Sequence, residues 1–215
     1  MTKYTHIIWD WNGTLLNDIG ASLQSVNDML ALRGKPPIDA DFYRECIGVP
    51  IIKFYERVFE LEKEDYNVII KQYNEGYMRH LEGCDLTDGA RDAIAYFAEN
   101  GAKQAVVSSS NNEQLKANMV KFGVDGCFDA VLGSSDFLAG SKIERAVAYL
   151  EKSGAEKGHI LVIGDLEHDA EMAAELGADC VLLTSGHEHI DRLKSVNAIL
   201  INNLHELIPV VENKQ

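Results

Sequence analysis

The sequence predicts an α/β protein in which a mainly parallel sheet carries an all-helical insert. Three observations predict it. An apolar, strand-like run occupies 5–9, residues 15–87 show helical periodicity without a convincing strand, and strands alternate with amphipathic helices from 88 onward. Such alternation is typical of βαβ units, which build parallel sheets. The first strand therefore joins a sheet whose other members follow the insert, so that the insert caps the crevice of the sheet.

The first strand ends at an acidic residue. Residues 7–9 are Ile-Ile-Trp, which predicts a strand buried on both faces. Asp10 follows at the carboxyl end, where open α/β sheets keep their ligand crevices. Two residues later comes Asn12, whose carboxamide forms hydrogen bonds but exchanges no proton near neutral pH.

The insert is predicted to be a helical domain. Its periodicity indicates helices at 19–33, 40–47, 51–61 and 64–82. The linkers at 14–18 and 83–88 are expected to act as hinges. The predicted domains are therefore a core of 1–15 and 86–215 and a helical cap of 16–85.

The rest of the core follows in strict alternation. Helices are predicted at 88–100, 111–122, 141–153, 168–176, near 188–194 and at 203–212. The strands between them are predicted at 104–108, 127–132, 159–164, 179–184 and 197–201.

Polar residues follow two of these later strands and open one helix. Asp165 and Asp169 come after the strand at 159–164, and Ser108 ends the strand at 104–108. Lys142 lies at the start of the predicted helix at 141–153. Two acidic strand ends, at Asp10 and Asp165, suggest a shared hard cation, because such ions prefer oxygen ligands. The bland alternative is that Asp165 and Asp169 are helix N-terminal charges stabilised by the helix dipole.

These motifs resemble the haloacid dehalogenase superfamily, and within it the phosphoglycolate-phosphatase-like enzymes with a helical cap. Asp-x-x-Gly-Thr at 10–14, Ser108, Lys142 and Gly-Asp-x-x-x-Asp at 164–169 occur in the family's order. The resemblance implies a Rossmann-like three-layer core. The departure is Asn12, where phosphatases of the family usually carry a second Asp.

The resemblance implies a role for each residue at the crevice. Asp10 would be the nucleophile that forms an aspartyl-phosphate, and Lys142 would pair with Asp10 and the phosphate. Asp10, Asp165 and the main-chain carbonyl of Asn12 would bind Mg²⁺, with Asp169 reaching the ion directly or through water.

The remaining predicted residues would contact the substrate. Ser108 would bind a phosphate oxygen, helped by the amides of Ser109, Gly13 and Thr14. Arg44 of the cap could clamp a carboxylate or a second phosphate, although an arginine on an amphipathic helix more often faces solvent.

Asn12 decides how much activity to expect. Loss of general acid and base help costs about 10²- to 10⁴-fold in rate. We therefore expect reduced activity, which an Asn12→Asp change could raise. An asparagine before glycine is also ordinary turn chemistry, and an engineered substitution is a further alternative.

The composition and net charge limit which kinds of partner the protein can bind. The chain has 215 residues, 46% of them hydrophobic, and a formal net charge of −14. This charge disfavours nucleic acid or an anionic membrane as partner, and it requires local compensation by a cation and Lys142 where phosphate binds. Four cysteines without Cys-x-x-Cys spacing indicate free thiols, and no apolar run is long enough to cross a membrane. A cytoplasmic location is therefore expected. The protein is also expected to be a monomer or a homodimer.

The function expected is a Mg²⁺-dependent phosphatase of small phosphorylated metabolites, phosphoglycolate being one candidate. One alternative is a non-catalytic protein that binds a phosphate ligand or a partner. Another is a hydrolase of phosphonates or haloacids. Phosphonate hydrolysis would need a cap lysine that forms a Schiff base, for which Lys53 is a weak candidate. His168 is expected to be the histidine nearest the chemistry, and His187 and His189 are expected in a loop near the crevice mouth.

Overall fold

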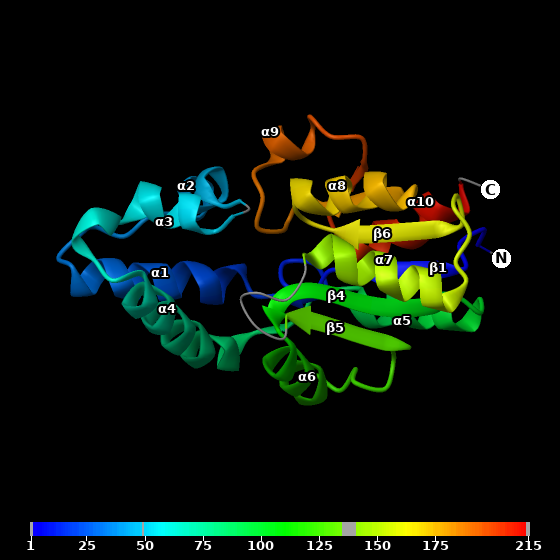
Figure 1. Cartoon of the computed structure of the whole chain (residues 1–215), viewed down its shortest axis with the longest axis horizontal. Coiled ribbons are helices and arrows are strands. Elements are labelled where there is room, and N and C mark those ends of the chain that lie inside the picture. Colours follow the sequence, from blue (N-terminus) through cyan, green and yellow to red (C-terminus); the bar gives the residue numbers. More distant parts are fainter. Residues whose placement is uncertain (1, 49, 135–140, 214–215) are drawn as a thin grey trace.

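The computed structural model describes residues 2–48, 50–134 and 141–213 and shows an α/β core joined to a group of helices at one end (Figure 1). The core contains a six-stranded parallel sheet with strand order β5-β4-β1-β6-β7-β8. The strands are β1 (His6–Trp9), β4 (Lys103–Asn111), β5 (Ala130–Ser134), β6 (Ile160–Gly164), β7 (Asp179–Leu183) and β8 (Ile199–Ile201).

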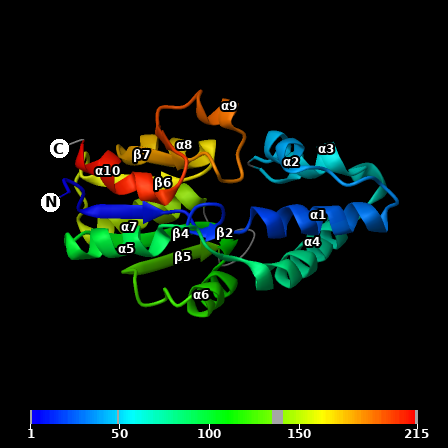
Figure 2. The same ribbon diagram turned by 180° about the vertical axis from the view of Figure 1, so that it is seen from behind.

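Helices cover both faces of the sheet, which confirms the predicted three layers (Figures 1 and 2). Ile7 and Trp9 of β1 point into the core on one face, and Ile8 points into the core on the other. The first face packs against α5 (Ala90–Glu99), α6 (Asn112–Lys121) and α10 (Leu207–Glu212), the last preceded by a 3₁₀ turn at Leu204–Glu206. The second packs against α7 (Lys142–Ser153), α8 (Glu167–Leu176) and the short α9 (Ile190–Leu193).

The sheet order places a crevice beside β1. The chain runs from β4 to β5 on one side of β1 and then crosses to β6 on the other. In open α/β sheets, ligands bind at such a reversal, outside the carboxyl ends of the strands. The helices between residues 19 and 80 lie at this end of the sheet (Figure 1).

Those helices have a hydrophobic core of their own. They are α1 (Ile19–Leu32), α2 (Ala40–Cys46), α3 (Ile52–Val58) and α4 (Tyr66–His80), with 3₁₀ turns at Leu61–Lys63 and Leu81–Gly83. The buried cluster among them includes Met29, Tyr43, Phe54 and Ile69. We call residues 16–85 the cap, with the boundaries that the sequence predicts.

The prediction that 15–87 contains no strand is wrong at its two ends. Leu16–Asn17 (β2) and Asp85–Leu86 (β3) pair antiparallel, with Leu16 opposite Leu86. Two-residue strands are too short to give a periodic pattern, and this pair forms between segments distant in sequence. Both predicted hinges therefore meet in one two-stranded ribbon at the junction of cap and core.

Candidate active site

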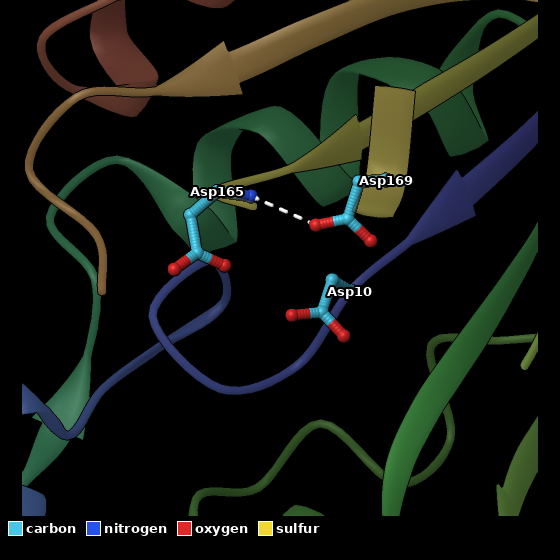
Figure 3. Close-up of side chains that lie close together, drawn as sticks. All are labelled: Asp10, Asp165 and Asp169. Atoms are coloured by element: carbon cyan, nitrogen blue, oxygen red, sulfur yellow. Dashed lines mark hydrogen bonds between the residues drawn. The ribbon is translucent and has the colours of Figure 1, made fainter. Parts of the chain in front are cut away.

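Three buried carboxylates converge at the carboxyl end of the sheet (Figure 3). Asp10 follows β1, Asp165 follows β6, and Asp169 lies in the first turn of α8. One oxygen from each lies within 4.8 Å of the others. Asp169 also accepts hydrogen bonds from the amides of Asp165 and Leu166, each 3.1 Å long, which fixes the loop between β6 and α8. The structure thus brings together the acidic residues that the sequence separates by more than 150 positions.

Glycines make room for these carboxylates. A Cβ on Gly13 would collide with the Asp165 carboxylate and the His187 ring, and one on Gly164 would collide with the Asp169 carboxylate. Gly13 also has a φ of 72°, which favours glycine. Gly186, which the sequence analysis did not single out, is equally close to Asp165.

Lys142 lies between two of the acids. A capping box formed by Ser141 and Glu144 starts α7, and the Nζ of Lys142 lies 2.6 Å from both Asp10 Oδ1 and Asp169 Oδ1. Burial alone would lower the pKa of Lys142, but the two carboxylates outweigh it and hold the pKa above its usual value. Lys142 therefore carries a full positive charge against the proposed nucleophile.

The donor set fits a metal cation. Burial raises the pKa of Asp165 well above its usual value, and the carboxylates of Asp10 and Asp169 add to the shift while His187 opposes it. Burial likewise raises the pKa of Asp10, against the opposing charge of Lys142. Three buried carboxylates with one lysine leave a surplus of negative charge, and a hard cation with oxygen ligands would neutralise it.

The Asp10–Thr14 turn serves the site differently from the prediction. The Thr14 hydroxyl donates to Asp165 Oδ1 over 2.9 Å, so it orients a predicted metal ligand. The Thr14 amide donates to the carbonyl of Trp11, and the Gly13 amide donates to the carbonyl of Leu16 and to Asp18 Oδ1. Both amides are thus engaged within the loop rather than turned to a phosphate, because the turn folds back on itself.

The three serines in the last part of β4, Ser108 to Ser110, have different contacts. Ser108 is buried, and its Oγ accepts a hydrogen bond of 3.1 Å from the amide of Ser110. Ser109 is exposed and lines a cavity between cap and core. The hydroxyl of Ser110 donates to Asn12 Oδ1 over 2.7 Å.

Asn12 and Asp18 form a hydrogen-bonded pair that the sequence did not reveal. The Asn12 amide nitrogen donates to Asp18 Oδ2 over 2.7 Å and to the Tyr77 hydroxyl over 2.9 Å. Tyr77 donates in turn to the same Asp18 oxygen over 2.7 Å. With the bond from Ser110, these contacts occupy both ends of the Asn12 carboxamide.

Asp18 is a buried anion. Burial alone would raise the pKa of Asp18, but His187 and the hydrogen bonds from Asn12 and Tyr77 outweigh it and hold the pKa below its usual value. His187 Nε2 lies 3.0 Å from Asp18 Oδ1, and its Nδ1 lies 3.0 Å from the hydroxyl of Tyr43 on the cap.

His187 is the histidine that the structure places in the site. Its amide donates to Asp165 Oδ2 over 2.7 Å, and its ring is buried. The expectation for His168 is wrong, because that side chain pairs with Glu171 along α8. The available signal was the Gly186-His187 pair after β7, a third strand end near the crevice.

Two arginines form hydrogen bonds between cap and core, one donating from the cap and one from the core. Arg44 of α2 donates to the carbonyl of Gly186 over 3.0 Å. Arg192 of α9 donates to the carbonyls of Arg44, over 3.0 Å, and of Ile47, and forms an ion pair with Glu188. Arg44 was predicted to bind substrate, but in this structure its guanidinium contacts the core main chain.

A cavity of about 610 Å³ lies between cap and core. The core contributes Asn12, Ser109, Ser110, Asn111, Gln114, Leu166 and His187, and the cap contributes Asp18, Ser22, Tyr43, Ile47, Gly48, Ile51, Tyr73, Asn74, Tyr77 and Met78. This volume is typical of a small-molecule site. Lys53 is exposed on α3 and lines an adjoining cavity instead.

The family follows from a comparison with known sequences. The model of the haloacid dehalogenase-like hydrolases matches residues 7–183, which include Asp10, Ser108, Lys142 and Asp165. The chain belongs to this family. It is thus a haloacid dehalogenase-like hydrolase, as the sequence motifs predict.

Several named relatives of this hydrolase are phosphatases. It is 21% identical to phosphoglycolate phosphatase 1 of Pseudomonas aeruginosa, over 96% of this chain and 79% of the relative. It is 26% identical to a phosphoglycolate phosphatase of Rhodobacter capsulatus, over 84% of each. A haloacid dehalogenase-like hydrolase from Streptococcus pneumoniae shares the fold, with a TM-score of 0.83 and 18% identity over 98% of this chain and 99% of that one. None of the described helices is long and apolar enough to cross a bilayer.

Proposed function

We propose that this hydrolase is a Mg²⁺-dependent phosphatase of small phosphorylated metabolites, with Asp10 as nucleophile. One observation carries the proposal. The Asp10 carboxylate lies at the end of β1, paired with buried Lys142 and grouped with Asp165 and Asp169. This arrangement gives a nucleophile, a fixed cation beside it and ligands for a second cation. The names of the relatives support the same class of substrate.

Each residue has a proposed role in phosphoryl transfer. Asp10 attacks phosphorus as the ester oxygen leaves, and water then cleaves the aspartyl-phosphate. Asp10, Asp165, Asp169 and the main-chain carbonyl of Asn12 would hold Mg²⁺. When bound, Mg²⁺ neutralises phosphate charge and orients its oxygens. Lys142 lowers the repulsion between Asp10 and the dianionic substrate.

The phosphate group is proposed to lie against the end of β4. We propose that the buried Ser108 and the exposed Ser109, both in the last part of β4, contact its oxygens. Asn12 can donate a hydrogen bond but no proton, so both the departure of the alcohol and the attack of water lack acid and base help from this position. A deficit of about 10²- to 10⁴-fold in rate is expected relative to a site with that help.

Phosphate release tests the proposal. Wild type is assayed on p-nitrophenyl phosphate and a panel of phosphorylated metabolites, with Mg²⁺ and with EDTA. Activity should require Mg²⁺ and should fall at least about 10³-fold in Asp10→Asn, which keeps the shape of the side chain but removes the nucleophile. Asp125→Asn changes an exposed aspartate of the α/β domain and is the matched control. Activity that survives EDTA or Asp10→Asn would contradict the proposal.

A second candidate is a protein that binds phosphate without turnover. The observation behind it is the fully engaged carboxamide of Asn12. It predicts Mg²⁺-dependent calorimetric binding of inorganic phosphate that Asp165→Asn abolishes. Turnover of any metabolite on the panel would reject it.

A further inference from the structure

The cavity between cap and core determines what can be attached to the phosphate. If phosphate lies at Asp10, the rest of the substrate extends past Asn12 into this space, so this inference rests on the proposed function. The cap side of the cavity is largely apolar and aromatic, and it includes Tyr73 and Tyr77, whose rings stack at 6.0 Å with 19° between their planes. Its polar groups outside Asp18 and His187 are serines, amides and phenols.

No lysine or arginine lines this cavity in the part of the chain that the structure describes. Residues 49 and 135–140, the internal stretches outside that part, contain neither residue type. Arg44, the nearest predicted clamp, donates to the Gly186 carbonyl. Lys53 and Arg57 line the adjoining cavity, and Arg57 also donates to the carbonyl of Glu45.

Among the described residues of the cavity wall, Asp18 and His187 are the one charged pair, and this pair cannot receive a second anion. His187 meets Asp18 through one ring nitrogen and Tyr43 through the other, so neither nitrogen is directed at a ligand. Asp18 brings a buried negative charge to the same wall. The charges of His187 and Asp18 offset each other, so a carboxylate or second phosphate on the substrate would enter without an unpaired counter-charge, which is unfavourable.

We propose that the substrate is a phosphate monoester of an uncharged, partly apolar alcohol or phenol, and that phosphorylated carboxylic acids such as phosphoglycolate are disfavoured. The cavity volume accommodates an aromatic ring or a short chain beyond the phosphate. The tyrosines and amides lining the cavity offer contacts to such a group without placing a charge against it.

A matched pair of substrates tests this inference. Wild type with Mg²⁺ is assayed on 4-carboxyphenyl phosphate and on its methyl ester, which differ in the charge far from phosphorus. The ester should have a kcat/KM about tenfold or more above that of the carboxylate. Equal values, or a preference for the carboxylate or for phosphoglycolate over its methyl ester, would overturn the inference. Absence of turnover with both and with p-nitrophenyl phosphate would instead overturn the proposed phosphatase function.

A variant with an added cation assigns the preference to the cavity. Asn74 is exposed on α4 and lines the cavity, so Asn74→Arg places a guanidinium there, while Asn74→Gln is the neutral control. Asn74→Arg should raise kcat/KM about tenfold for the carboxylate and little for the ester, and Asn74→Gln should keep the wild-type ratio. A ratio that Asn74→Arg leaves unchanged would contradict the assignment to this cavity.

Discussion

Asn12 lies where a carboxylate would face another carboxylate. Its amide nitrogen donates to Asp18 over 2.7 Å, and its oxygen accepts from Ser110. The negative charge at this end of the turn therefore belongs to Asp18, which the Gly13 amide, Tyr77 and His187 also contact. This complementarity favours Asn12 as a native part of the site.

An Asn12→Asp change is predicted to lower stability rather than restore activity. The new carboxylate would lose the bond to Asp18 and repel it, at a cost of about 1–3 kcal/mol in the free energy of unfolding. Asn12→Asp with Asp18→Asn exchanges the two groups and should recover most of the loss. Urea denaturation of the two single variants and the double variant measures the coupling. An Asn12→Asp protein of wild-type stability and at least tenfold higher activity would contradict this account.

At the residue scale, the sequence could predict the groups that end strands. Asp10, Ser108 and Asp165 each follow an apolar run, so their position at one edge of a parallel sheet could be inferred. Asp18 and His187 could not be paired, because they are 169 residues apart and meet only through the packing of a core loop against the cap hinge. The Gly13 amide donates to the same Asp18 carboxylate.

At the scale of elements, α2 and the loop around α9 hold the cap against the core. Arg192→Ala removes the donors to the Arg44 and Ile47 carbonyls at the end of α2. KM should rise about tenfold with a smaller change in kcat, because net losses of about 1–1.5 kcal/mol are typical of such bonds. Arg91→Ala is the matched control, since Arg91 also donates to two carbonyls but within the core. An unchanged KM in Arg192→Ala would contradict this role for α9.

Within the cap, an ion pair ties the end of α1 to the segment before α4. Hydrogen bonds from Arg33 hold the pKa of Glu64 below its usual value. A lowered folded pKa means that the stabilisation is present above about pH 4.5 and is lost as the pH falls through the folded pKa. Glu64→Gln should therefore lower the unfolding temperature at pH 7 more than at pH 4. Equal effects at both values would show that the ionised pair contributes nothing.

The order of the helices and strands could be predicted because most of them carry clear periodicity. The ribbon of β2 and β3 could not, because each strand has two residues and gains its partner only when the cap folds back on the core. The predicted helix at 64–82 covers α4 and the first two residues of the 3₁₀ turn Leu81–Gly83 that follows it. Such a change of helix type at a helix end leaves the apolar pattern unaltered.

At the scale of the whole molecule, folding confines three carboxylates to one buried group. Metal binding should therefore stabilise the folded chain. Mg²⁺ at about 100 times its Kd contributes about 2.7 kcal/mol, which corresponds to roughly 5–10 °C in unfolding temperature for a chain of this size. Asp165→Asn should abolish the increase and Asp125→Asn should keep it. An unfolding temperature of wild type that Mg²⁺ leaves unchanged would contradict the metal site.

The fold of the chain was easier to predict than the contacts between cap and core. The three layers follow from the alternation of strands and helices, whereas the order of the strands in the sheet was not predicted. How the cap meets the core depends on side chains such as Arg44, Tyr43 and Arg192, whose partners are main-chain carbonyls and a buried histidine. A main-chain carbonyl has no residue identity, so such partners leave no pattern in the sequence.

The most direct test of the central claim is to locate the phosphoryl group during turnover. Because Asn12 supplies no base, hydrolysis of the aspartyl-phosphate should be slow, and the intermediate should accumulate. Wild type mixed with Mg²⁺ and a labelled aryl phosphate, then quenched in acid, should release a burst of phenol close to one equivalent. Mass spectrometry should place the phosphoryl group on Asp10. Turnover with no phosphoryl group on Asp10, or with one on another residue, would contradict the account.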